Sequence, residues 1–197
     1  CDLLDNDCDG ITDEGGEDLY ERSTGENDPV GNNSCEDATT LEQVGENDEE
    51  VTLYNVMSIY RTVLTNPGDV DFYKFKAADQ LSFCVNPLST HCFDLTLQFI
   101  LPEEARAGDY QACIAFSDED DSCDYEEARV CTGDPDVEFE EATGIYTMHM
   151  QWAGRCYLSD DRDFTIEVKG TSDDINACTP YGLKMELNVS DGACEEE

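Results

Sequence analysis

Basic residues are scarce in this 197-residue chain, which has 10 lysines and arginines against 48 acidic residues and a formal net charge of −38. This composition argues against nucleic acid as a partner, because phosphate binding depends on lysine and arginine. It disfavours anionic membrane surfaces for the same reason. Three explanations for the charge remain: divalent-cation binding, life in a saline medium, and colloidal repulsion at an exposed surface.

Histidine is also scarce, with only His91 and His149 in the chain. Neither a Gly-x-Ser-x-Gly elbow nor a His-Glu-x-x-His motif occurs, and no carboxylate pair is marked out for glycoside hydrolysis. Met148-His149-Met150 contains copper ligands. Neighbouring side chains of a strand point to opposite faces, however, so these three cannot bind one ion. We expect a protein that is not an enzyme, and we assign no catalytic residue.

Long apolar runs and a signal peptide are absent, which predicts a mature form or a fragment without a transmembrane segment. Helical periodicity is absent too, apart from a turn expected around residues 36–41. Short runs with alternating apolar and polar residues occur instead, and they predict strands over 51–56, 58–64, 72–76, 81–85, 93–100, 110–116, 145–152, 164–169 and 183–189. About nine strands at this spacing predict an all-β fold, an antiparallel β-sandwich.

Cysteine, by contrast, is abundant, with 11 residues. No Cys-x-x-Cys spacing occurs, and zinc ribbons and thioredoxin-like sites usually need it. We therefore expect disulfides and a secreted or cell-surface protein. Because the count is odd, at least one cysteine is unpaired, joined to another chain or modified. We expect disulfides at Cys178 and Cys194 of the C-terminal tail, although the sequence does not give the connectivity.

Residues 1–17 have the ligand order of a calcium loop. Gly10 at loop position 6 allows the sharp turn, and Gly16 stands at position 12 instead of the usual bidentate Glu. Glu14 or Glu17 would therefore complete the shell. The other predicted ligands, at positions 1, 3, 5, 7 and 9, are Asp5, Asp7, Asp9, Ile11 (through its backbone carbonyl) and Asp13.

Two cysteines flank this loop, and a Cys1–Cys8 disulfide would staple it; lipid attachment at Cys1 is the alternative. The stretch from Cys1 to Glu14 reads Cys-Asp-Leu-Leu-Asp-Asn-Asp-Cys-Asp-Gly-Ile-Thr-Asp-Glu. It resembles the MopE-type metal-binding motif of secreted bacterial proteins, with Leu3 in place of the usual glycine. The resemblance implies metal binding outside the cell and is silent on overall activity.

Further motifs follow in the order Asn33-Ser-Cys-Glu-Asp-Ala38, Gly68-Asp-Val-Asp-Phe-Tyr-Lys-Phe75, Phe93-Asp-Leu-Thr-Leu97, Gly144-Ile-Tyr-Thr-Met148 and Phe164-Thr-Ile-Glu-Val168. They resemble the bacterial pre-peptidase C-terminal domain, a jelly-roll β-sandwich of secreted proteases and surface proteins. With this resemblance, the chain divides into the stapled calcium loop (1–17), a linker (18–34) and the sandwich (35–197). A cysteine-rich insertion at about 101–143 and an extra C-terminal strand depart from the family.

The same resemblance implies a second calcium site. In collagen-binding relatives of the domain, acids before the first strand join aspartates of the Asp-x-Asp strand. The matching residues are Glu26, Asp28, Asp69 and Asp71. Carboxylates from two separated segments would supply much of the oxygen shell that calcium needs. The alternative is that Asp69 and Asp71 only make turn hydrogen bonds after Pro67-Gly68.

Together, these features predict a non-catalytic bacterial protein, secreted or displayed on the cell surface, in which calcium fixes the N-terminal segment. Acidic, polar chain ends are usually disordered unless ions, disulfides or neighbouring subunits tie them down. We therefore expect self-association or contact with other surface proteins, as in a surface assembly or extracellular filament. The alternative is an accessory module that targets a secreted hydrolase to a glycan or a protein.

Overall fold

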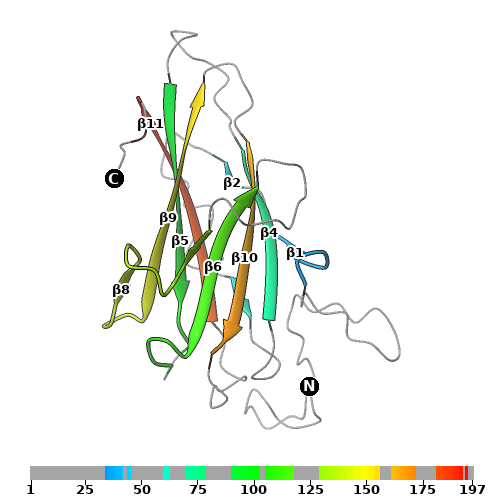
Figure 1. Ribbon diagram of the computed structural model, residues 1–197, viewed down its shortest axis with the longest axis vertical. Coiled ribbons are helices and arrows are strands. Elements are labelled where there is room, and N and C mark those ends of the chain that lie inside the picture. Colours follow the sequence, from blue (N-terminus) through cyan, green and yellow to red (C-terminus); the bar gives the residue numbers. More distant parts are fainter. Residues whose placement is uncertain are drawn as a thin grey trace.

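The described part of the chain is built from strands. The computed structural model describes residues 34–41, 44–45, 60–62, 70–78, 90–102, 105–117, 129–155, 161–171, 181–192 and 194 (Figure 1). Within these ranges there is no helix. The strands are β1 (Thr39–Thr40), β2 (Val44–Gly45), β3 (Tyr60–Thr62), β4 (Val70–Ala78), β5 (Thr90–Ile100), β6 (Tyr110–Ser117), β7 (Arg129–Cys131), β8 (Glu138–Glu140), β9 (Ile145–Arg155), β10 (Arg162–Gly170) and β11 (Tyr181–Asp191). The prediction of an all-β fold is confirmed.

The strands form two sheets. The first has the order β1-β4-β10-β6-β7, with β2 also paired to β4, and the second has the order β3-β11-β5-β9-β8. In Figure 1 the strands β4, β10 and β6 form one layer, and β5, β9 and β11 lie beside them in the other. All strand pairs are antiparallel except β1 and β2, which run parallel to β4.

Alternation along the long strands places the core between the sheets. In β5, the side chains of Phe93, Leu95, Leu97 and Phe99 are buried, while the residues between them are only partly buried. Aromatic rings join the layers: Trp152 of the second sheet lies 5.5 Å from Phe164 of the first, between ring centroids. Since one apolar cluster holds residues of both sheets, they form the two halves of a sandwich.

Seven of the predicted strands coincide with described ones, because 58–64, 72–76, 93–100, 110–116, 145–152, 164–169 and 183–189 each overlap a strand of the structure. The predicted strands 51–56 and 81–85 lie outside the described residues. The turn expected around 36–41 occurs slightly earlier, where the N–H of Asp37 donates to the carbonyl of Ser34 at 3.1 Å. The chain then enters β1, since Thr39 and Thr40 pair with β4.

Two disulfides have both cysteines within the described residues. Cys92–Cys194 joins residues 102 positions apart, and Cys113–Cys131 joins directly opposite residues of β6 and β7. Cys194 is therefore bonded to Cys92. The other cysteines expected in disulfides, Cys1, Cys8 and Cys178, lie outside the described residues.

Candidate functional site

Asp71 is the one predicted calcium ligand that lies within the described residues, in β4. Among those residues, no group of three or more histidines, cysteines and acids could hold a metal ion. The remaining predicted ligands fall outside the described ranges: Asp5, Asp7, Asp9, Ile11, Asp13, Glu14, Glu26, Asp28 and Asp69. Both calcium sites therefore stay predictions.

Asp71 points into the core and belongs to a polar chain between the two sheets. The Tyr181 hydroxyl donates a hydrogen bond to Asp71 Oδ2, and the Tyr181 and Tyr73 hydroxyl oxygens are 2.8 Å apart. Tyr181 begins β11 in the second sheet, whereas Asp71 and Tyr73 lie on β4 in the first. Because a buried carboxylate is costly without hydrogen bonds, Tyr181 stabilises Asp71 where it lies. This hydrogen bond across the two sheets was not expected from the sequence, and the second calcium site that includes Asp71 stays a prediction.

The Tyr181 hydroxyl is held in its neutral form by this environment. Complete burial raises the pKa of Tyr181 well above its ordinary value of 10.0. The nearby Tyr73 and Asp71 raise this pKa further, through charge repulsion and hydrogen bonds that favour the protonated hydroxyl. Tyr181 therefore acts as a donor throughout the neutral pH range.

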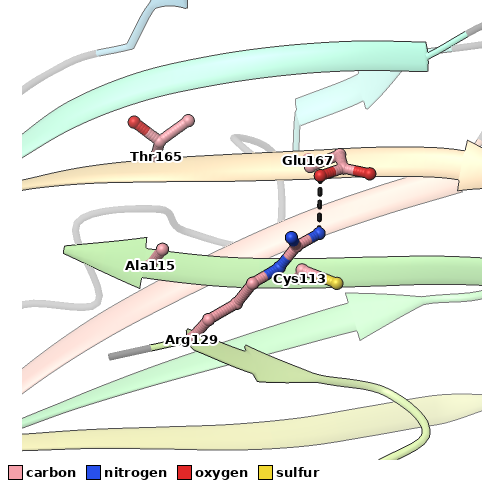
Figure 2. Close-up of a pocket in the computed structure, with 5 residues that line it drawn as sticks. All are labelled: Cys113, Ala115, Arg129, Thr165 and Glu167. Atoms are coloured by element: carbon pink, nitrogen blue, oxygen red, sulfur yellow. Dashed lines mark hydrogen bonds and ion pairs between the residues drawn. The ribbon is translucent and has the colours of Figure 1, made fainter. Parts of the chain in front are cut away.

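The outer face of the first sheet carries a shallow pocket (Figure 2). Arg129 extends from β7 across β6, so that its Nη2 lies 2.6 Å from Oε2 of Glu167 on β10. Beneath the arginine, the side chains of Cys113 and Ala115 are buried although they point away from the core. The remaining lining residue is Thr165. Arg129 thus acts as a cover over the Cys113–Cys131 disulfide.

Basic residues concentrate on this outer face. Lys74 and Lys76 alternate along β4, Lys169 lies on β10, and Arg129 lies on β7; these are four of the ten basic residues in the chain. Lys169 Nζ lies 2.9 Å from Glu167 Oε1, so Glu167 is shared by two cations. Lys76 pairs with Asp161 at 2.9 Å.

The outer face of the second sheet carries a hydrogen-bonded group around Asp94. His149 Nδ1 lies 3.1 Å from Asp94 Oδ1, and Gln151 Nε2 donates to Asp94 Oδ2 at 3.1 Å. Met148 and Met150 are buried while His149 is exposed. The three residues therefore lie on opposite faces of β9, as the alternation predicts, and cannot bind one copper ion together.

Comparisons with known proteins assign no family: no protein-family model and no curated protein sequence matches this chain. In the described residues, no helix is long and apolar enough to cross a membrane. Function therefore has to be inferred from the residues of this chain.

The basic outer face was not predicted from the sequence. One signal for it is present, because Lys74 and Lys76 are two positions apart in a predicted strand and therefore lie on the same side of it.

Proposed function

We propose that this chain is a non-catalytic, calcium-binding structural protein of bacteria, located outside the cell, and a subunit of a surface assembly or extracellular filament. The observation that carries the proposal is the N-terminal ligand series from Asp5 to Glu14, which precedes a sandwich tied by disulfides. Disulfides persist in oxidising compartments. External calcium would be available there to the clustered carboxylates.

Calcium would act by removing charge repulsion. In a chain with a net charge of −38, neighbouring carboxylates repel one another unless a cation neutralises them. Binding to the folded state alone would then stabilise that state by mass action. We include in this proposal a jelly-roll sandwich of the pre-peptidase C-terminal type and a Cys1–Cys8 staple.

The test is calcium titration by calorimetry, with thermal melting in calcium and in chelator. We expect chelator to lower the melting temperature by roughly 5–10 °C, given the stabilisation that a saturating ligand provides to a domain of this size. The triple variant Asp5→Asn, Asp7→Asn, Asp9→Asn should melt at one temperature in both conditions. Its matched control is the triple variant Glu138→Gln, Glu140→Gln, Glu141→Gln, which also removes three carboxylate charges, from exposed residues, and should keep the calcium effect. A wild-type melting temperature unmoved by chelator would contradict the proposal.

A second candidate function is the targeting of a secreted hydrolase to a glycan. The observation that favours it is the hydrogen-bonded group of Asp94, His149 and Gln151 on an open sheet face, since ordered polar groups can pair with sugar hydroxyls. Binding of soluble polysaccharides in affinity electrophoresis, lost on Asp94→Ala, would support it. Equal mobility with and without every polysaccharide tested would argue against it.

A further inference from the structure

We propose that β4 is a force-bearing strand, which leaves the sandwich when the chain is pulled, while a covalent loop keeps the strands after it together. The loop is closed by the Cys92–Cys194 disulfide, whose cysteines are 102 positions apart. The inference rests on the proposed function, because a subunit of a surface assembly or filament is pulled when the assembly is stretched. It gives a role to the buried hydrogen-bonded chain of Asp71, Tyr181 and Tyr73.

The Cys92–Cys194 disulfide is a covalent shortcut for tension. Tension that enters the chain before Cys92 and leaves it after Cys194 passes through the sulfur–sulfur bond, so the backbone between the two cysteines is not extended. Strands β5 to β11 lie within this loop, and they belong to both sheets. Of the described strands, β1, β2, β3 and β4 precede the loop, and tension can extend them.

Among the strands before the loop, β4 is held by the most extensive contacts. Strands β1, β2 and β3 have two or three residues each and pair at only as many positions. In contrast, β4 pairs with β10 at eight positions. Its buried Phe75 also stacks on Phe164 of β10, with ring centroids 5.2 Å apart. The short strands should therefore detach at lower force, and β4 then carries the load.

The buried hydrogen-bonded chain joins β4 to the covalent loop. Asp71 and Tyr73 lie on β4, whereas Tyr181 is the first residue of β11, within the loop. The Tyr181 hydroxyl donates to Asp71 Oδ2 and lies 2.8 Å from the Tyr73 hydroxyl oxygen. A hydrogen bond to a carboxylate is stronger than one between neutral groups. Because β4 cannot leave without breaking this bond, Tyr181 helps to set the force at which β4 detaches.

The tension runs along the strands. Asp71, near the beginning of β4, contacts Tyr181 at the beginning of β11, so both strands begin at the same end of the sandwich. Cys194 follows the end of β11, and its partner Cys92 pairs with Ser190 near that same end. A strand of 11 residues spans roughly 35 Å. The β4–β10 pairs are therefore loaded together in shear, not one after another, and they resist as a group.

A long-range disulfide also stabilises a fold by restricting the unfolded chain. That role would account for the Cys92–Cys194 bond taken alone, and it predicts a change in unfolding free energy when the bond is removed. It makes no prediction about how far a stretched chain extends. Extension under force therefore distinguishes the two roles.

The experiment stretches the full chain, with its disulfides formed and in calcium, between handles at its two ends in optical tweezers. Cys92→Ser with Cys194→Ser should add up to about 290 Å to the total extension. The gain comes from the 102 positions of the loop, apart from the 18 that Cys113–Cys131 still holds. The matched control is Cys113→Ser with Cys131→Ser. It removes a disulfide inside the loop and should leave the wild-type extension unchanged.

The wild type itself replaces the cysteine variant if that variant does not fold. A phosphine reductant added after β4 has detached should release the loop in the same molecule.

Tyr181→Phe tests the force-bearing contact. At constant force, the time before β4 detaches should be roughly tenfold shorter than in the wild type, because the hydrogen bond to Asp71 is lost. The total extension should not change. Tyr146→Phe is the matched control, since it removes a hydroxyl from β9, within the loop, and should keep the wild-type lifetime.

The outcomes separate this inference from the proposed function. Equal total extension of the wild type and the Cys92→Ser, Cys194→Ser variant would overturn the covalent loop. A Tyr181→Phe lifetime equal to that of the wild type would overturn the role of the buried chain in holding β4. Neither result bears on calcium binding. A melting temperature unmoved by chelator overturns the proposed function, and with it the source of the tension, whereas the extensions and lifetimes test β4 directly.

Discussion

Two aspartates, one on each sheet, show how burial changes the role of the same side chain. Asp71 lies between the sheets and accepts a hydrogen bond from Tyr181, whereas Asp94 lies on an outer face and pairs with His149 and Gln151. Asp71 is fully buried, while the Asp94 side chain is 31% exposed. Water can replace the partners of Asp94 but not those of Asp71. We therefore expect the buried group to affect stability and the exposed group to affect only recognition.

The matched pair Asp71→Ala and Asp94→Ala tests this difference most strongly. The buried substitution removes the acceptor of the Tyr181 hydroxyl and leaves a small void, which should cost about 3 kcal/mol of unfolding free energy. The exposed substitution should cost less than about 1 kcal/mol. Urea denaturation of both variants measures the difference.

Running that denaturation in calcium and in chelator sharpens the result. If Asp71 also binds calcium, as the resemblance implies, the Asp71→Ala effect should be larger in calcium. Equal destabilisation by the two substitutions would contradict the comparison, because it would mean that burial does not decide the role of the carboxylate.

We expect Tyr181→Phe to have an intermediate effect on the free energy of unfolding, and this effect should depend on pH. Since the folded-state pKa of Tyr181 is raised above 10.0, the folded chain holds this proton more tightly than the unfolded chain. The resulting stabilisation is fully present below about pH 10 and is lost as pH rises through the folded-state pKa. Above about pH 10, wild-type stability should therefore fall more steeply than that of Tyr181→Phe, by up to about 1.4 kcal/mol per pH unit.

Tyr110→Phe is the comparison for this pH experiment. Burial raises the pKa of Tyr110 as well, and the negative charge of Asp109 raises it further. Tyr110 is not a member of the hydrogen-bonded chain of Asp71, Tyr181 and Tyr73. Its removal should flatten the alkaline slope less than Tyr181→Phe does. Identical slopes in the wild type and Tyr181→Phe would show that Tyr181 titrates alike in the folded and unfolded states.

The long strands were predictable from the sequence because they have a local pattern. The buried hydrogen-bonded chain of Asp71, Tyr181 and Tyr73 was not, because it joins residues far apart in the sequence. Alternation over eight or more residues is a local signal, and it located β5, β6, β9, β10 and β11. The short edge strands β1, β2, β7 and β8 have two or three residues each, too few to show a period. Whether Asp71 is buried depends on Tyr181, 110 positions away. The basic outer face likewise requires the register of β4, β10 and β7, which only the folded chain supplies.

The smallest expected effect belongs to the exposed pair of Asp94 and His149, and a double-mutant cycle measures it. The His149 side chain is 48% exposed, so solvent competes for its contact with Asp94 at 3.1 Å. Exposed pairs of this kind typically contribute below about 1 kcal/mol. We expect Asp94→Ala, His149→Ala and the double variant to unfold at nearly the same urea concentration, with a coupling energy under about 0.5 kcal/mol. A coupling of about 2 kcal/mol would show that this outer face is as tightly constrained as the space between the sheets, and the difference between Asp71 and Asp94 would then have to arise from something other than access to water.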